Sequence, residues 1–438
     1  MDFSFRLFFT LLYGIVNCKE YFRGYNVDRI FVNSSQNIIK FKHWVEKFDG
    51  VDIWHIANHV PFFLDLSVSP RIQEIFDNYV NEQNFGKTVL VDDLGSIVDY
   101  PPKTKRNRRS NDQQKFSLYR YNSFSEIMKW LADLKKNYES LVDLEEIGQS
   151  FEKRPILVVK IGKSARNHVK PAVWIDAGIH SREWLSVATA LYVINEFMVQ
   201  YSRNESSIVN LIDRVDFHIA PVINPDGYEY SRSMNRLWRK TRSRHEILVD
   251  QKKITCVGVD ANRNFDYFWG SVDDMSDDNG SCSDGYSGPS PGSEPETRSI
   301  SSALRRLKPS LMAYLTLHSY GQMWLSPWGY AAYKPSNYQR QRDMALLAID
   351  ALQGVHGTPY SFGTVSDLLY PASGTSVDFA HSLNITYAYA IELRPGETGV
   401  VRQNPFRGFM QQESQIEPTG QETFAAFAAL TEAILNES

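Results

Sequence analysis

The sequence predicts an α/β protein in which a mixed, mostly parallel twisted sheet carries helices on both faces, preceded by a small α+β domain. After about residue 119, apolar strand patterns alternate with long helical patterns, which favours a sheet covered on both faces. Before residue 94, shorter patterns follow in the order βαββαβ, and a polar linker separates the two regions. At 438 residues with 42% apolar composition, the chain is long enough for more than one domain.

The chain begins with a short apolar segment. Arg6 precedes an apolar run of about ten residues, Leu7–Val16, which is too short to cross a bilayer but typical of a secretory signal. We therefore expect residues 1–18 to be a signal peptide and the protein to be secreted and extracellular; a buried N-terminal strand or helix is the alternative. No other stretch has the ~20 apolar residues of a membrane span. Five sequons are compatible with secretion and glycosylation: Asn33, Asn204, Asn279, Asn384 and Asn436.

The first domain is expected within residues 19–109. Its strand patterns are DRIFVN, VDIWHI, FFLDLSV and KTVLVDD, and its helical patterns are SQNIIKFKHWVEKF and RIQEIFDNYVNEQN. Because their order is βαββαβ, we expect two helices on a four-stranded sheet, which is a ferredoxin-like arrangement.

A basic linker, residues 101–115, follows this domain. Its sequence, PPKTKRNRRSNDQQK, lacks the apolar side chains that packing requires. An R-x-R-R pattern in an exposed linker of a secreted protein suits proteases specific for basic residues. We therefore expect an activating protease to cut after Arg109 and release a second domain, residues 110–438. A solvated linker that stays uncut is the alternative.

Three cysteines are present. Cys18 lies at the expected end of the signal peptide, so removal of that peptide leaves Cys256 and Cys282. In an oxidising compartment this pair would form one disulfide that closes a polar loop, worth about 3 kcal/mol in the chain-entropy model. Two unpaired buried thiols are the alternative.

The second domain begins with a capping box, Ser123 and Glu126, before a helical pattern. Five buried strand patterns follow: PILVVKIG, AVWIDAGIH, VDFHIAPVI, LMAYLTLHSY and TYAYAIELR. Ligands of such sheets bind outside the carboxyl ends of the strands. Four polar residues fall at or just past those ends, as a shared site requires: His180, Asn224, His318 and Glu392.

Some of these residues suit a catalytic zinc ion. A histidine at a strand end and a glutamate in the first turn of the next helix, His180 and Glu183, can approach one atom. His318 on a neighbouring strand would complete a three-ligand set with one coordination position open. The H-x-x-E pattern alone is a weak signal, because a capped helix start beside a hydrogen-bonded core histidine has the same sequence.

Six ordered motifs make the zinc hypothesis specific. They are HSREW (180–184), PVINPDGYEYSRSMNRLWRKTRS (221–243), GVDANRNF (258–265), LHSYGQMWLSPWGY (317–330), LYPASGTSVDF (369–379) and AIELR (390–394). Together they resemble the pancreatic-type A/B zinc metallocarboxypeptidases, and the βαββαβ segment resembles the inhibitory pro-domain of that family. The resemblance implies the carboxypeptidase fold, one zinc ion per catalytic domain, peptide or protein substrates, and synthesis as a zymogen.

The resemblance also implies roles for single residues. It makes His180, Glu183 and His318 the zinc ligands, Glu392 the general base, and Arg239 the group that polarises the scissile carbonyl. It gives substrate binding to Arg182, Asn262, Arg263, Tyr320, Tyr370 and Val377.

The sequence departs from the family after Arg394. The segment RPGETGVVRQNPFRGFM is about eight residues longer than the family's connection at this point. It borders the expected active-site mouth, and Phe409 is the best match for the aromatic contact that the family makes from this loop.

The chemistry can also be argued from the residue types. Zinc lowers the pKa of its bound water toward ~7, and a nearby carboxylate can take the proton. Glu392 ends an apolar strand, where a carboxylate without a functional partner would be costly. A cation such as Arg239 would stabilise the oxyanion, and the Asn262/Arg263 pair offers planar donors for a terminal carboxylate. Asp260 is a candidate acceptor for the second nitrogen of a ligand histidine.

Specificity depends on the register of LYPASGTSVDF. By the resemblance, Val377 forms the floor of the side-chain pocket and Asp378 is structural. The expected walls are neutral: Thr316, Leu325, Gly329, Val365, Leu369, Ala372 and Ala390. This register predicts a preference for apolar and aromatic C-terminal residues. The competing register, with Asp378 facing the pocket, predicts the opposite.

Other functions stay open at this point. A secreted binding protein could keep the fold without catalysis, and an amidohydrolase could use the same zinc site on lipid-linked or amino-acid conjugates. The segment NRLWRKTRS could bind nucleic acid or heparin, but its single tryptophan and the net charge of -4 argue against this. We expect a monomer that binds no nucleic acid.

Overall fold

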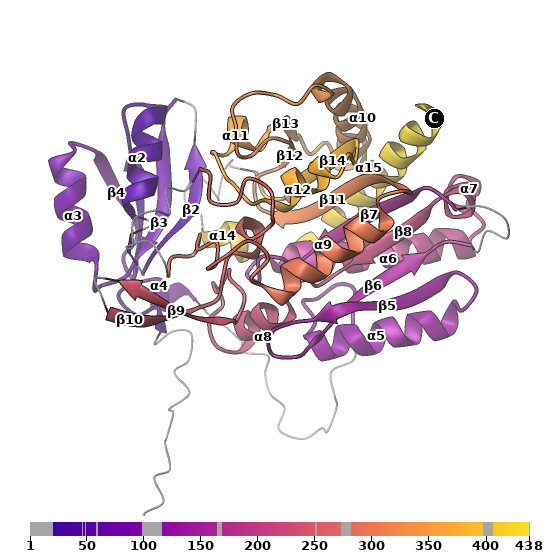
Figure 1. The fold of residues 1–438 in the computed structure, drawn as a ribbon, viewed down its shortest axis with the longest axis horizontal. Coiled ribbons are helices and arrows are strands. Elements are labelled where there is room, and N and C mark those ends of the chain that lie inside the picture. The colour runs from indigo at the N-terminus through magenta and orange to yellow at the C-terminus, as the bar shows by residue number, and fades with distance from the viewer. Residues whose placement is uncertain are drawn as a thin grey trace, which may run out of the picture.

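The computed structural model describes residues 21–437 except 46, 49, 58–59, 99–115, 164–168, 250–251, 273–281 and 397–405 (Figure 1). The expected signal peptide, the cleavage point after Arg109 and the sequon at Asn279 lie outside the described residues. Among those described, no helix combines the length and apolar character needed to cross a membrane.

The N-terminal domain is an antiparallel sheet with two helices on one face. Its strands are β1 (Asn26–Phe31), β2 (Val51–Ala57), β3 (Phe63–Val68) and β4 (Gly86–Val91), in the order β2-β3-β1-β4. Helices α2 (Ser35–Val45) and α3 (Gln73–Glu82) pack on the sheet through Phe41 and Phe76, and the short α4 (Leu94–Ile97) follows. The βαββαβ prediction is confirmed. The sheet order leaves β2 at one edge.

The C-terminal domain is built on an eight-stranded mixed sheet. Its strands in chain order are β5 (Val142–Gln149), β6 (Pro155–Ile161), β7 (Ala172–Ala177), β8 (Asp216–Ala220), β11 (Leu311–Ser319), β12 (Met323–Ser326), β13 (Ser361–Thr364) and β14 (Tyr387–Leu393). The sheet order is β13-β12-β14-β11-β7-β8-β6-β5. The central strands β14, β11, β7 and β8 run parallel, whereas β5, β6 and β8 pair antiparallel, as do β12 and β14.

Helices cover both faces of this sheet, as predicted. The first face carries α5 (Phe124–Asn137), α6 (Trp184–Ser202), α7 (Ser206–Arg214), α10 (Tyr338–His356) and α15 (Ile416–Glu437). The second carries α9 (Pro295–Leu307), α11 (Val365–Leu368) and α12 (Ser376–Ser382). The capping box is present, because Ser123 accepts from the backbone N–H of Glu126 and the Glu126 side chain reaches back. Both apolar faces of the sheet are therefore buried in separate cores.

A hairpin outside the main sheet was not predicted from the sequence. It consists of β9 (Arg244–Val249) and β10 (Lys252–Val257), which pair antiparallel and carry many charged residues. Cys256 on β10 is bonded to Cys282, with their Cα atoms 5.1 Å apart. The predicted disulfide is therefore confirmed, and it ties the hairpin to the chain that leads into α9.

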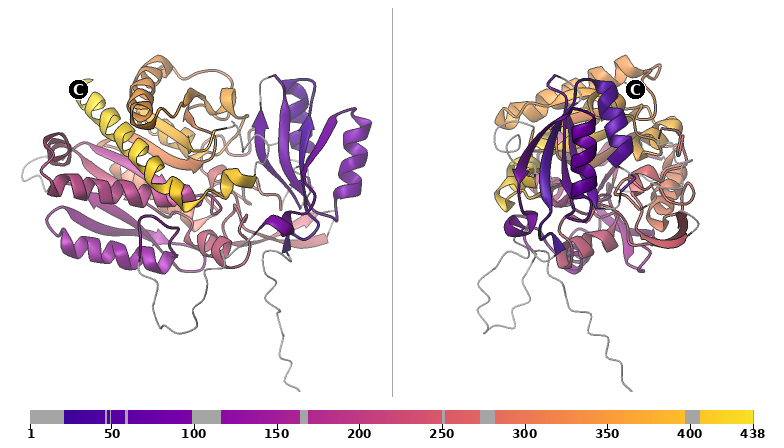
Figure 2. Two further views of the ribbon diagram at one scale, coloured as in Figure 1. Left: turned by 180° about the vertical axis from the view of Figure 1, so that it is seen from behind. Right: turned by 90° about the vertical axis from the view of Figure 1, so that its left-hand side faces the viewer.

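The two domains meet at the carboxyl ends of the central strands. Figure 1 shows β2 as the strand of the N-terminal domain nearest the larger domain, while α3 lies on the outer side. In the two further views of Figure 2, the N-terminal domain lies at one end of the molecule. The residues expected at the strand ends therefore lie beneath the N-terminal domain.

Candidate active site and metal centre

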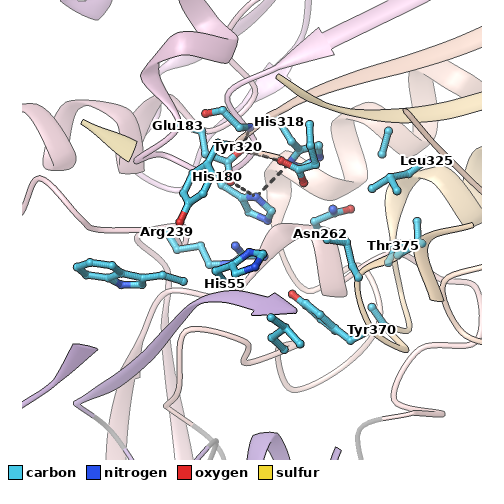
Figure 3. Close-up of a pocket in the computed structure, with 18 of the residues that line it drawn as sticks. His55, His180, Glu183, Arg239, Asn262, His318, Tyr320, Leu325, Tyr370 and Thr375 are labelled. Carbon is cyan, nitrogen blue, oxygen red and sulfur yellow. Dashed lines mark hydrogen bonds and ion pairs between the residues drawn. The ribbon is translucent and has the colours of Figure 1, made fainter. Parts of the chain in front are cut away.

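Three buried side chains converge at the strand ends. His180 follows β7, Glu183 immediately precedes α6, and His318 lies near the end of β11. The Nδ1 atom of His180 is 2.8 Å from Glu183 Oε1 and 3.1 Å from His318 Nδ1, which is 3.2 Å from Glu183 Oε2. Figure 3 shows the three side chains grouped at one end of a cavity. Among the described residues, they are the group of three whose donor atoms could hold one metal ion.

The spacing of these atoms fits a zinc ion. Tetrahedral zinc with ligand bonds of 2.0–2.1 Å keeps its ligand atoms about 3.3 Å apart. Two of the observed separations, 3.1 and 3.2 Å, are close to this value, and the 2.8 Å between His180 Nδ1 and Glu183 Oε1 is shorter. His180 Nε2 lies 3.2 Å from Asp260 Oδ1, an arrangement that orients a ligand imidazole through its other nitrogen. The donor set is therefore suited to zinc.

The local electrostatics favour the metal-binding forms of Glu183 and His180. Burial opposes protonation of His318, but Glu183 outweighs burial and raises the pKa of His318. Burial opposes charge on the Glu183 carboxyl, but His180 and His318 outweigh it and hold the pKa of Glu183 well below its usual range. Burial, with Arg239 nearby, lowers the pKa of His180. An ionised carboxylate and a neutral imidazole are the forms that bind metal.

Glu392 lies on the other side of the histidine pair. It is on β14, directly opposite His318 in the parallel register of β11 and β14. Burial raises the pKa of Glu392; His318 opposes this shift and Glu183 adds to it. A carboxyl group with a raised pKa can accept and return a proton near neutral pH.

Asp260 holds two functional groups at once. Its Oδ1 faces His180, and its Oδ2 accepts from Arg239 Nε at 2.8 Å. Burial disfavours the charged form of Asp260, but Arg239 and His180 outweigh burial and lower its pKa well below the usual value. The Asp260 carboxylate therefore orients both the His180 imidazole and the Arg239 guanidinium.

A set of donors lies on the far side of the cavity. Arg263 Nη2 donates to the Tyr370 hydroxyl at 3.1 Å. Asn262 Oδ1 accepts from the backbone N–H of Ser376 at 2.8 Å, so its amide group presents N–H donors elsewhere. All three side chains line the same cavity as the metal group. These side chains can bind the carboxylate of a ligand at a fixed distance from the three metal-binding side chains.

A neutral pocket adjoins these donors. Its lining residues are Leu325, Val365, Leu369, Ala372, Thr375, Val377 and Ala390. Asp378 is buried and accepts from the backbone N–H groups of Gly329 and Tyr330 at 3.0 and 3.1 Å. Thr375 was missed from the sequence. Thr316 and Gly329, expected in the walls, are not among the residues that line the cavity; Thr316 lies 3.4 Å from His318 Nε2, and the Gly329 backbone N–H donates to Asp378.

The N-terminal domain fills the mouth of this cavity. Ile53, Trp54, His55 and Ile56, four consecutive residues of β2, line it. Pairing of β2 with β3 shifts register at Trp54, and such a bulge turns a side chain away from the regular pleat. The Trp54 ring lies 6.3 Å from the ring of Phe409, which also lines the cavity beside Tyr320. The strand therefore enters the cavity along its free edge.

Polar contacts between the two domains lie beside these β2 residues. Arg182 Nη1 forms a short hydrogen bond with Asp52 Oδ2 and lies 3.7 Å from Asp284 Oδ2. Trp54 Nε1 donates to the same Asp52 oxygen at 2.6 Å. The Lys42 ammonium lies 5.3 Å from the Tyr370 ring. These contacts were not predicted from the sequence, because polar residues on a predicted strand do not reveal a partner in another domain.

Comparisons with known proteins agree with this geometry. Residues 127–426 match the family model of zinc carboxypeptidases, and residues 29–100 match that of the carboxypeptidase activation peptide. Carboxypeptidase A2 of Mus musculus is 33% identical over 431 residues, which cover 96% of each chain. Carboxypeptidase B of Astacus astacus is 39% identical over 305 residues, which cover 69% of this chain and 93% of that protein.

Solved structures share the whole fold. Carboxypeptidase A from Helicoverpa armigera superposes with a TM-score of 0.81 at 27% identity, over 95% of this chain and 99% of that one. The thrombin activatable fibrinolysis inhibitor superposes with a TM-score of 0.75 at 29% identity, over 95% of this chain and 100% of that one.

Proposed function

Because the chain belongs to the zinc carboxypeptidase family and carries an activation peptide, we propose that it is a secreted zymogen whose cut form removes apolar and aromatic C-terminal residues from peptides. One observation carries the proposal. The three metal-binding side chains, the side chains that could donate to a terminal carboxylate, and a neutral side-chain pocket all line a single cavity. An enzyme that cleaves the last peptide bond needs these three features at fixed separations.

Zinc held by His180, Glu183 and His318 would supply a Lewis acid and a water molecule of lowered pKa. Glu392, opposite His318 on the neighbouring strand, would take the proton from that water and return it to the leaving amine. Arg239 would donate to the oxygen that becomes negatively charged, a contribution typically worth about 100- to 1000-fold in rate. Asp260 would keep the Arg239 guanidinium aimed, because it already accepts from its Nε.

Recognition of a free C-terminus would fall to Asn262, Arg263 and Tyr370. The guanidinium and amide are planar donors, and their geometry suits the two oxygens of a carboxylate. Arg263 and the Tyr370 hydroxyl already contact each other, so the substrate carboxylate would enter a preformed pair. Arg182 and Tyr320, at the mouth, would contact residues upstream of the scissile bond.

The pocket supports a preference for apolar side chains. A C-terminal Phe, Tyr, Trp or Leu would gain roughly 1.5 to 3 kcal/mol by burial there. Lys or Arg would leave a desolvated cation without a carboxylate partner, since Asp378 is committed to backbone N–H groups. The inhibitory role of the N-terminal domain is supported by the four β2 residues that line the same cavity.

The test uses the purified protein cut after Arg109. We expect release of C-terminal Phe from a peptide at least tenfold faster, in kcat/KM, than release of Arg from the same peptide, and loss of activity with a chelator. Val377→Asp should shift the preference toward Arg. Val377→Asn should not, because asparagine has nearly the shape of aspartate but no charge. A wild-type preference for Arg would reject the pocket argument, and chelator-resistant activity would reject the metal.

A further inference from the structure

Four polar side chains are buried behind the wall of the cavity, in the core between the sheet and α12. Asp176 lies on β7, Tyr314 and Thr316 lie on β11, and Ser376 begins α12; each is 0% exposed. Asp176 and Thr316 are directly opposite each other in the register of β7 and β11. None of the four is among the residues that line the cavity. We call these four residues the polar cluster.

The polar cluster holds oxygen atoms that lack a direct partner. Asp176 Oδ2 accepts from Trp174 Nε1 at 2.7 Å. Within the part of the chain that the structure describes, Asp176 Oδ1, the Tyr314 hydroxyl and Ser376 Oγ have no hydrogen-bond partner. Burial and the charge of Asp176 raise the pKa of Tyr314, and Ser376 opposes this shift, so the three side chains are neighbours. Such atoms are costly to bury, and a water molecule bonded to about three of them is the common solution.

The two ends of the polar cluster contact two separate parts of the active site. At one end, Thr316 Oγ1 lies 3.4 Å from His318 Nε2, whereas His318 Nδ1 faces the other two metal-binding side chains. At the other end, the backbone N–H of Ser376 donates to Asn262 Oδ1 at 2.8 Å. The polar cluster therefore connects a candidate metal ligand with a side chain that could donate to a terminal carboxylate.

A carboxylate is the group that suits the centre of this cluster. It only accepts hydrogen bonds, whereas each hydroxyl can both donate and accept, so several O–H groups and the Trp174 N–H can point at Asp176 together. Asparagine has the same shape but replaces one acceptor oxygen with a donor. It would therefore break the pattern without leaving a hole. A displacement of about 1 Å between two anchors of a bound substrate can cost about 100-fold in rate.

We propose that Asp176 is a positioning residue that, together with one internal water molecule, holds the start of α12 against β11 and so fixes the distance from His318 to Asn262. The inference rests on the proposed exopeptidase function and deepens it. That distance determines which peptide bond of a substrate reaches the metal once its terminal carboxylate is bound. The polar cluster thus sets the selection of the last peptide bond from behind the cavity.

Three ligands that share a benzyl group test the proposal on the cut, zinc-loaded protein by calorimetry. Phenylpropanoate carries a carboxylate, phenylpropanethiol carries a thiol for the metal, and benzyl(sulfanylmethyl)acetate carries both. Asp176→Asn should raise Kd for the ligand with both groups about tenfold and leave Kd for the other two within about twofold, because only the first needs both anchors at a fixed distance. Tyr314→Phe should show the same pattern, and the double variant should lose no more than Asp176→Asn alone.

The matched control is Thr189→Val. Thr189 lies on α6 in the other core, is 0% exposed, and its hydroxyl also lacks a partner among the described residues. This variant should leave all three Kd values unchanged. Equal losses for all three ligands in Asp176→Asn would show a general loss of structure and overturn the proposal, as would an unchanged Kd for the ligand with both groups.

Amide hydrogen exchange on the uncut chain gives a readout that needs no ligand. Asp176→Asn should speed exchange of the Ser376 N–H, which is bonded to Asn262, whereas Thr189→Val should not. Unchanged exchange at Ser376 would reject the role of Asp176. If the cut wild type binds none of the three ligands, the proposed function fails, while the exchange data still decide whether Asp176 holds the start of α12.

Discussion

The two domains meet at one cavity but make their contacts in different ways. In the catalytic domain, functional charges are held by partners from the same domain: Asp260 binds both His180 and Arg239, and Arg263 contacts Tyr370. The N-terminal domain reaches across with single contacts, such as Asp52 on Arg182. Because the groups around the metal site are held within one domain, we expect their geometry to persist when the N-terminal domain leaves, whereas inhibition should depend on the contacts across the interface.

Substitutions at the metal site and at Glu392 should have the largest effect on activity. We predict that His180→Ala loses zinc and activity together, because a three-ligand set loses one member. Glu392→Gln should keep zinc and bind product but lose about 100- to 10,000-fold in kcat, since its amide cannot act as a base. Metal analysis and kinetics on both cut variants decide the matter. Wild-type activity in Glu392→Gln would reject the assigned mechanism.

Preventing the cut should leave the catalytic geometry intact but inaccessible. We predict that Arg108→Ala combined with Arg109→Ala gives a secreted protein that stays uncut and hydrolyses large peptides poorly, because β2 occupies the cavity. Cleavage at a site for an unrelated protease engineered into the same linker should restore activity. Full activity of the uncut variant on large peptides would refute inhibition by the N-terminal domain.

Removing one contact across the interface should have a smaller effect. We predict that Asp52→Ala weakens docking of the cut N-terminal domain about tenfold in Kd, because Arg182 keeps Asp284 as a second acid nearby. Dissociation after cleavage can be followed by the rise of activity on dilution. Asp77→Ala is the control, since Asp77 pairs with Lys87 within the N-terminal domain. Equal effects of the two variants would show that the change is not specific to the interface.

The smallest expected effect is the pH dependence with which the cut N-terminal domain docks on the catalytic domain. Burial raises the pKa of Asp52 at the interface; Arg182 opposes this shift and Asp284 adds to it. The docked form therefore retains a proton that the free domain releases, so docking is favoured at low pH and weakens as pH rises through the raised pKa. We expect Kd to rise severalfold between about pH 5.5 and about pH 8.

The Asp284→Asn variant should flatten this dependence, because it removes one cause of the raised pKa. The other charged groups lining the neighbouring interface cavities are Lys42, Arg239, Lys240, Asp260 and Arg263. A Kd that falls with rising pH would contradict the assignment to Asp52.

The sequence could predict the parts of the site that follow from local pattern. His180, His318 and Glu392 come together because the carboxyl ends of parallel strands share an edge, and each residue can be counted from its strand. Thr316, expected in the pocket wall, is not among the residues that line the cavity, although it pairs with the lining residue Ala390 in the register of β11 and β14. The hairpin β9–β10 was missed because its charged strands lack a strong apolar alternation. The contact of Asp52 with Arg182, 130 residues away, depends on how two domains pack, which local patterns do not encode.

The free edge of β2 has a consequence for the fate of the activation peptide. While the zymogen is intact, the catalytic domain covers this edge, including the bulged Trp54. Once the linker is cut and the domains part, an edge strand with exposed backbone donors and acceptors and apolar neighbours is a template for self-association. The released domain should therefore aggregate or be degraded soon after the linker is cut, which would keep it from docking on the active site again.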